Sequence, residues 1–357
     1  MGREKFSFKN LDKPKIKVII DYDGTLTQEE KQVDKLAELA FDTLSKEILK
    51  IPRDKIREDY YNTQQKILAE PHKYTWRVNG ISACYCNEGA FVLNTVTIQE
   101  MLDRNKFYKN CIETVFKNLE YDPITECTNY LFHKNSTLIK PIFRDGVRET
   151  LIKMIEHPQI QPIVMTNSKT DKVKQHLETI GFTQQKEFKI IKSFRISHKE
   201  FKSNELAKTT KEEYKNEEPC VVTQKGIKSS KFEYKIDILG DTRQYHMDPE
   251  WSHFFDHPEL GKIQILPIYD KYRVDLRRPT YYEAILDQAK DGSRVVACGD
   301  IFSLVGSVPL MMGMDFILLK APYVPKWSET FVRKQPNGKV ITNIKELIME
   351  LEEILNH

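Results

Sequence analysis

The feature that most constrains the fold is segment 16–25, which reads IKVIIDYDGT. Residues 16–20 are apolar except for Lys17 and rich in β-branched side chains, which predicts a buried strand. Asp21 and Asp23 follow it, and open α/β sheets bind ligands where their strands end. Carboxylates this close repel each other, so they need a metal ion, or one of them must hold a proton. The segment therefore predicts a charged site at the end of a buried strand.

The same segment resembles the first motif of the haloacid dehalogenase (HAD) superfamily of phosphohydrolases. In that superfamily the first Asp attacks phosphorus and the second acts as general acid and base. The resemblance therefore implies that Asp21 and Asp23 are catalytic. Members that cleave carbon–halogen bonds lack the second Asp, so Asp23 favours phosphoryl transfer. The alternative is a surface turn, because Asp-Gly is common in turns, but a turn would not need a fully apolar strand before it.

The composition excludes several classes of protein. The 357 residues are enough for a core and a second domain. The 55 basic and 52 acidic residues nearly cancel, so no strong field argues for a nucleic-acid or membrane-surface partner. The sequence contains neither an apolar run long enough to span a membrane nor an N-terminal secretory signal. Six scattered cysteines favour a reduced, cytoplasmic protein.

The resemblance implies a three-layer α/β sandwich with a parallel, Rossmann-like sheet. Apolar residues at helical spacing make the region after the first motif mostly helical, although residues 76–96 look irregular. An insertion at this point of the HAD fold is a cap that covers the active site. The implied organisation is a core of residues 1–28, 140–186 and 263–357, a mostly helical cap of residues 29–139, and a second insertion of residues 187–262.

The second insertion, of α+β type, is not explained by the resemblance. Apolar and charged side chains alternate from Phe232 to Ile238, which predicts a half-buried, antiparallel strand. Residues 221–223 could pair with it. Residues 195–218 are dense in Lys and Glu, which predicts a solvated segment.

Two later stretches resemble the phosphate-binding motifs of the superfamily. Thr166 and Asn167 follow an expected strand and match the second motif, which implies that they hold phosphoryl oxygens; a helix-capping role is compatible with this. Arg278 precedes a proline and matches the third motif by position. The resemblance implies that its charge bridges the attacking carboxylate and the phosphoryl oxygens. The alternative for Arg278 is a surface residue, and the rival cations are Lys225, Lys228 and Lys231.

The pair Gly299-Asp300 resembles the fourth motif, but Leu304 stands where a second acid often lies. The resemblance implies a magnesium site made of Asp21, the backbone carbonyl of Asp23, and Asp300. Three protein ligands can suffice, because Mg²⁺ completes its six oxygens with waters and substrate phosphate. Ser303 is a candidate to hold a metal-bound water.

The implied function is a magnesium-dependent phosphohydrolase, a phosphomonoesterase that forms an aspartyl phosphate on Asp21. Two alternatives stay open. The Leu304 departure allows a non-catalytic HAD-like binding protein, and the second insertion could dock a phosphoprotein, as in a protein phosphatase. The expected substrate is a phosphorylated small molecule or a phosphoprotein.

Overall fold

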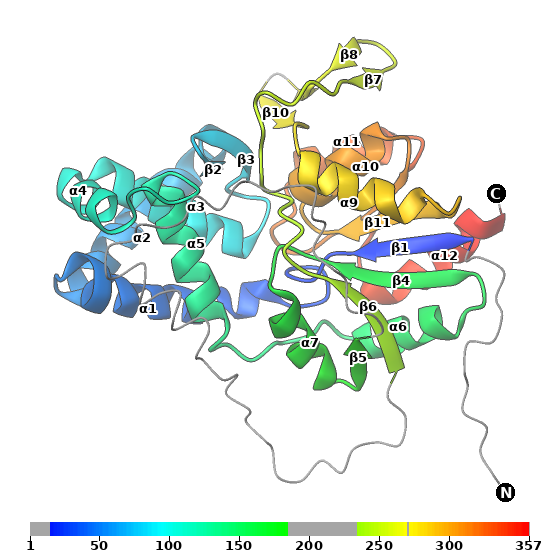
Figure 1. Cartoon of the computed structure of the whole chain (residues 1–357), viewed down its shortest axis with the longest axis horizontal. Coiled ribbons are helices and arrows are strands. Elements are labelled where there is room, and N and C mark those ends of the chain that lie inside the picture. Colours follow the sequence, from blue (N-terminus) through cyan, green and yellow to red (C-terminus); the bar gives the residue numbers. More distant parts are fainter. Residues whose placement is uncertain (1–14, 185–233, 270, 357) are drawn as a thin grey trace, which may run out of the picture.

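The computed structural model describes residues 15–184, 234–269 and 271–356, which form an α/β core beside a helical cap (Figure 1). Seven parallel strands make the central sheet, in the order β13-β12-β11-β1-β4-β6-β5. The chain extends the sheet to one side of β1 and later to the other, so β1 lies at a switch point. The strands are β1 (Ile16–Ile20), β4 (Ile160–Met165), β5 (Phe182–Gln184), β6 (Tyr234–Leu239), β11 (Arg294–Gly299), β12 (Asp315–Leu319) and β13 (Gly338–Ile341).

Helices cover both faces of this sheet and produce three layers. Successive side chains of a strand point to opposite faces, and Ile19 packs into one apolar cluster while Val18 and Ile20 pack into another. The first cluster is completed by α9 (Pro279–Ala289), η4 (Phe302–Gly306), α10 (Ser307–Met311) and α11 (Lys326–Lys334). The second is completed by α6 (Val147–Glu156), α7 (Thr170–Glu178), η5 (Ile344–Glu346) and α12 (Leu347–Asn356). The predicted α/β sandwich is confirmed.

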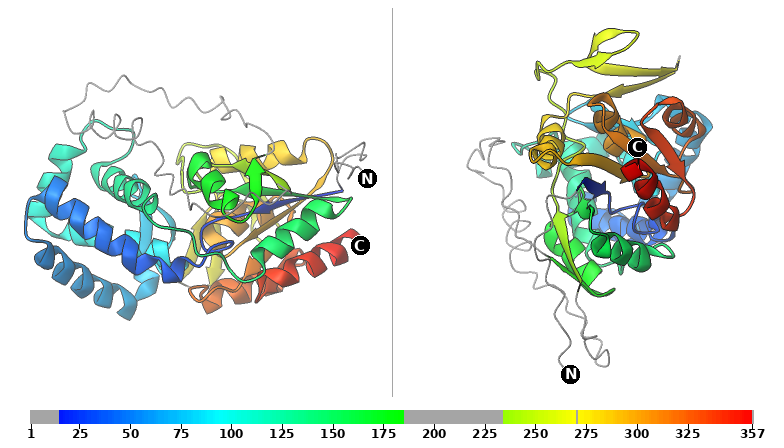
Figure 2. Two further views of the ribbon diagram at one scale, coloured as in Figure 1. Left: turned by 90° about the horizontal axis from the view of Figure 1, so that it is seen from below. Right: turned by 90° about the vertical axis from the view of Figure 1, so that its right-hand side faces the viewer.

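The cap lies on the side of the core opposite the end of α12 (Figure 2). It has its own apolar cluster, which includes Phe41, Tyr60 and Leu102. Its helices are η1 (Glu29–Lys31), α1 (Val33–Thr43), η2 (Leu44–Leu49), α2 (Arg53–Ala69), η3 (Pro71–Lys73), α3 (Ala90–Arg104), α4 (Lys106–Val115) and α5 (Pro123–Ser136). The mostly helical character predicted for this region is confirmed.

Residues 76–96 are not irregular as expected. They include most of an antiparallel hairpin, β2 (Thr75–Val78) and β3 (Ile81–Tyr85), and the first turns of α3. Asn79 and Gly80 form the turn with φ of 51° and 76°, and Asn-Gly is a strong hairpin signal because both residues tolerate positive φ.

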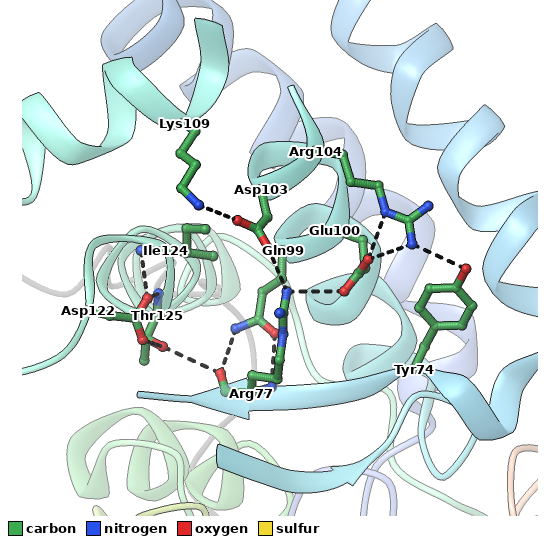
Figure 3. Close-up of polar contacts among 10 residues, drawn as sticks. All are labelled: Tyr74, Arg77, Gln99, Glu100, Asp103, Arg104, Lys109, Asp122, Ile124 and Thr125. Carbon is green, nitrogen blue, oxygen red and sulfur yellow. Dashed lines mark hydrogen bonds and ion pairs between the residues drawn. The ribbon is translucent and has the colours of Figure 1, made fainter. Parts of the chain in front are cut away.

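Polar contacts hold the hairpin to α3 (Figure 3). The Arg77 backbone N–H donates to Gln99 Oε1 at 3.0 Å, and Gln99 Nε2 donates back to the Arg77 carbonyl at 2.7 Å. The Arg77 guanidinium also pairs with Glu100 and Asp103. These contacts fix β2 relative to the helical part of the cap.

The strand predicted at 232–238 differs from expectation. It is β6, which pairs in parallel with β4 and β5 inside the central sheet. Its Asp237 is buried and accepts a hydrogen bond from Gln161 Nε2 at 2.8 Å, so the alternation of charge does not mark a solvent face. The proposed pairing segment 221–223, the solvated segment 195–218 and the three rival lysines lie outside the described residues.

Residues 255–269 and 271–275, at the end of the expected second insertion and the start of the next core segment, form an arm that extends from the core (Figures 1 and 2). The arm consists of two antiparallel hairpins. Its strands are β7 (Phe255–His257), β8 (Gly261–Ile263), β9 (Ile265–Tyr269) and β10 (Tyr272–Asp275). Among the described helices, none combines the length and the apolar character that crossing a membrane requires.

Candidate active site

The site lies where β1, β4 and β11 end, because parallel strands bring their carboxyl ends to one edge of the sheet. Asp21 and Asp23 follow β1, Thr166 and Asn167 follow β4, and Asp300 follows β11. The Thr25 hydroxyl donates to Asp300 Oδ1 at 3.0 Å and accepts from the Asp300 backbone N–H at 3.1 Å. These two contacts join the loops after β1 and β11.

Gly24 allows this close approach of the two loops. Its φ is +81°, and a Cβ there would lie 2.1 Å from Asp300 Oδ2. Both the left-handed backbone and the space taken by the carboxylate therefore require glycine.

Four acids gather at this edge, and three of them have raised pKa values. Burial, with Asp300 and Asp23 adding like charge, raises the pKa of Asp21 well above its usual value. Burial raises the pKa of Asp300 to about 7. Burial and then the charge of Asp300 raise the pKa of Glu29. Such a cluster favours a bound cation or shared protons. The sequence reasoning missed Glu29, which stands six residues after Asp23.

Asp23 has two partners on the α7 side. The Ser168 hydroxyl donates to Asp23 Oδ2 at 2.6 Å, and Lys172 Nζ lies 3.7 Å from Asp23 Oδ1. Lys172 also donates to Ser168 Oγ at 3.1 Å. Lys172 is thus a cation beside Asp23, although the sequence reasoning did not name it. Its position four residues after Ser168, at the start of α7, is the signal that could have found it.

Thr166 and Asn167 both line the pocket beside Asp21. Thr166 is buried, and its hydroxyl accepts the Ser168 backbone N–H at 3.1 Å, which supports the helix-capping alternative. Asn167 makes two hydrogen bonds with Gln244. The Gln244 backbone N–H donates to Asn167 Oδ1 at 2.7 Å, and Asn167 Nδ2 donates to Gln244 Oε1 at 3.0 Å. Binding of phosphoryl oxygens by these residues stays a prediction.

The phosphate-binding role expected for Arg278 must be corrected. Arg278 is fully buried and is absent from the described lining of the pocket. Its guanidinium donates to three backbone carbonyls, those of Asp275 at 3.1 Å, Ala83 at 2.5 Å and Gln244. Ala83 belongs to the cap hairpin. Arg278 therefore joins cap and core, because its rigid fork of donors can reach several carbonyls at once.

Two buried glutamates accept backbone N–H groups at helix N-termini, and the second of them links cap and core. Glu29, in η1 where the chain passes from the core into the cap, accepts the Ala90 and Phe91 backbone N–H groups at the start of α3. Glu88, in the cap, accepts the backbone N–H of Ser303 at 2.9 Å and its hydroxyl at 2.6 Å. Carboxylates favour the exposed N–H groups of helix N-termini. The Ser303 hydroxyl is thus already hydrogen-bonded to Glu88. The expectation that Ser303 holds a metal-bound water is not supported.

Replacing Glu88 by Gln tests this link. The amide keeps one acceptor oxygen but turns an NH₂ group toward the Ser303 donors, so we expect the free energy of unfolding to fall by about 2 kcal/mol. Urea unfolding of the two proteins measures the difference. The control, Glu113→Gln on the exposed face of α4, should change stability by less than about 0.5 kcal/mol. Equal stability of all three proteins would contradict the link.

The donor set fits a magnesium ion. Asp300 Oδ2 is buried and has no hydrogen-bond partner among the described residues, and carboxylate and carbonyl oxygens are the ligands that Mg²⁺ prefers. No group of three or more His, Cys, Asp or Glu side chains in residues 15–184, 234–269 and 271–356 is already arranged as a metal site. The expected set requires only two such side chains, Asp21 and Asp300, because its third ligand is a backbone oxygen.

A pocket between cap and core opens onto these acids. The space that it spans, open solvent at its mouth included, is about 720 Å³. Asp21, Asp23 and Glu29 line one end. Cap residues line the other end, and Leu304 and Tyr245 complete the wall from the core side. An acid-lined end covered by a cap suits a reaction that must exclude bulk water.

Comparisons with known proteins found solved structures that are similar to this one. No protein-family model and no curated protein matches the chain. A 2-haloacid dehalogenase from Pseudomonas syringae is 12% identical with a TM-score of 0.40, over 96% of this chain and 99% of that one. A haloacid dehalogenase-like family hydrolase from Xanthomonas campestris is 12% identical with a TM-score of 0.38, over 96% and 97%. CbbY from Rhodobacter sphaeroides, in complex with xylulose-1,5-bisphosphate, is 11% identical with a TM-score of 0.38, over 94% and 96%.

Proposed function

We propose that this protein is a HAD-type, magnesium-dependent phosphomonoesterase that works through an aspartyl phosphate on Asp21. The observation that carries the proposal is the group at the ends of β1, β4 and β11. There a buried Asp21 faces a pocket, and Asp23 beside it has a hydroxyl and an ammonium partner. This is the arrangement that a carboxylate nucleophile and a neighbouring acid and base require.

The proposed reaction has two displacements. An Asp21 carboxylate oxygen attacks phosphorus, and the bond to the leaving oxygen breaks as Asp23 gives that oxygen a proton. Asp23 then removes a proton from water, whose oxygen attacks phosphorus and releases phosphate and free Asp21. The hydrogen bond from Ser168 holds Asp23 in position. A magnesium ion on Asp21, the Asp23 carbonyl and Asp300 would neutralise charge on the phosphoryl oxygens.

The direct test uses the full chain and phenyl phosphate. We expect phosphate release with added magnesium and loss of release with excess EDTA. Activity that copurifies with the protein supports the proposal. Absence of turnover over a panel of phosphomonoesters, together with no magnesium binding at millimolar concentration, would favour a binding protein instead. Leu304, buried in the pocket wall where the resemblance has an acid, is the observation behind that second candidate.

Lys172 is the proposed cation for the phosphoryl group. Its ammonium lies beside Asp23 and Ser168 and would stabilise charge on the transferring group. We expect Lys172→Met to lower kcat/KM by about 100-fold, the usual cost of losing one such donor. Steady-state kinetics with phenyl phosphate measures the effect. Lys174→Met on the same helix is the control and should leave kcat/KM within about twofold; equal losses in both variants would contradict the role.

The cysteines bear on the cellular location. Cys84, Cys86, Cys111, Cys127 and Cys298 are free thiols, and four of these five are buried. Disulfides are rare in the reducing cytosol. We therefore propose that the protein is cytoplasmic.

We propose that its substrate is a phosphorylated small molecule or a phosphoprotein.

A further inference from the structure

The cap wall of the pocket is neutral. All the charged residues that line the pocket are acids, Asp21, Asp23 and Glu29, and they lie at the phosphoryl end. Within the described residues no Lys or Arg lines this pocket. Lys172 lies beside Asp23 and the Phe132 ring but does not line the pocket. A second anionic group at the cap wall would therefore lose its water without direct contact with a cation, which is costly.

Three polar side chains of the cap wall are available to a ligand. Thr95 on α3, and Asn129 and His133 on α5, line the pocket and are only partly buried. In the described part of the chain, none of these three side chains makes a hydrogen bond. Burial, with the nearby charges of Lys169 and Lys172, lowers the pKa of His133 to about 3. At neutral pH all three groups are thus uncharged donors or acceptors, suited to hydroxyl or carbonyl groups.

Aromatic side chains also line the pocket, three from the cap (Trp76, Phe91 and Phe132) and Tyr245 from the core side. The Trp76 ring lies 5.1 Å from the Tyr245 ring, centroid to centroid, at an angle of 41°. Phe132 packs edge-on against Phe91, with 5.7 Å between the two ring centroids. Lys172 Nζ lies 5.3 Å from the Phe132 ring centroid. Arg77 is hydrogen-bonded to Gln99 on α3 (Figure 3). Trp76 is its neighbour on β2, so these bonds also restrain the backbone of Trp76. Flat apolar walls favour ligands that carry a ring.

We infer that the pocket selects phosphomonoesters whose leaving group is uncharged and carries a ring, and that it rejects substrates with a second anion. The inference rests on the proposed function for turnover, but not for binding. The cap wall would take the ring between its aromatic side chains, and Thr95, Asn129 and His133 would meet the polar groups of that ring.

Three matched substrates test this selection on the full-length protein. Phenyl phosphate and 4-carbamoylphenyl phosphate are neutral in the leaving group, whereas 4-carboxyphenyl phosphate adds one charge to the same ring. We expect kcat/KM for the carboxy compound to be at least about tenfold below that for the carbamoyl compound. Equal values for these two, with turnover intact, would overturn the inference and leave the proposed function standing.

A positive charge placed on the cap wall should weaken or cancel the selection. Asn129→Lys puts a cation on the cap wall, and we expect it to raise kcat/KM for the carboxy compound about tenfold relative to the carbamoyl compound. Asn110→Lys adds the same charge on the exposed face of α4 and should leave the ratio unchanged. A shift of the same size in both variants would mean that overall charge, not the pocket, sets the ratio, and would overturn the inference.

Binding separates the inference from the proposed chemistry. In Asp21→Asn, quenching of Trp76 fluorescence reports the dissociation constant of each compound without turnover, and Trp76→Phe identifies the signal. We expect the carbamoyl compound to bind at least about fivefold more tightly than the carboxy compound. If the unmodified protein shows no phosphatase activity, this binding preference would support the inference while refuting the proposed function. Absence of binding and of turnover for all three compounds would refute both.

Discussion

Replacing Asp21 by Asn is expected to lower kcat for phenyl phosphate by about 10⁴-fold or more. The amide has almost the shape of the carboxylate but lacks the charged oxygen that attacks phosphorus, and removal of a nucleophile usually costs this much. The measurement is steady-state phosphate release with magnesium present. Asp54→Asn, on the exposed surface of α2, is the control and should keep full activity. Full activity of Asp21→Asn would show that the proposed mechanism is wrong.

The same variant should not be less stable than the unmodified protein. Burial and the neighbouring acids raise the pKa of Asp21 in the folded state, so the folded protein binds this proton more tightly than the unfolded chain does. The ionised form therefore costs stability above the folded pKa, and that cost disappears as the pH falls. At pH 8 without divalent cations, we expect Asp21→Asn to melt at the same or a higher temperature. A large fall in its melting temperature would mean that lost activity reflects unfolding.

The part of the site that the sequence predicts is local. The acids after β1 and β11 each follow a short buried run, so strand and side chain can be identified in one segment. Parallel pairing then brings the strand ends together, and Asp21, Asp23, Thr166 and Asp300 share one edge of the sheet.

The residues that the sequence reasoning missed act across long separations. Lys172 meets Asp23, and Glu88 meets Ser303, only after the sheet and the cap have assembled. Arg278 stands at the position where a phosphate-binding cation was expected, but chain order does not tell which way a side chain points. The alternation of apolar and charged residues predicts a solvent-facing Asp237, but Asp237 is buried against Gln161, which lies on another strand. In each case the deciding fact is a tertiary contact.

The second large effect concerns Arg278, for which Arg278→Met should lower the free energy of unfolding by about 3 kcal/mol or more. Methionine fills part of the space but leaves the carbonyls of Ala83, Gln244 and Asp275 buried without donors, and hydrogen bonds to charged groups contribute about 1.5–3 kcal/mol each. Arg278→Lys should recover little of this, because an ammonium is a point charge and cannot span three carbonyls. Urea unfolding measures both variants.

The same variants decide between the structural and the phosphate-binding roles of Arg278. If Arg278 held phosphate, Arg278→Met would raise KM or lower kcat at unchanged stability, and Arg278→Lys would keep much of the activity. If Arg278 instead links cap and core, the free energy of unfolding should fall in both variants. Activity should then be lost only in proportion to the fraction of unfolded protein. Arg277→Met is the neighbouring control: Arg277 is partly exposed and pairs with Asp275, so its loss should cost about 1 kcal/mol or less. Equal stability of the Arg277 and Arg278 variants would contradict the link, since only a side chain buried among carbonyls leaves unpaired acceptors behind when it is removed.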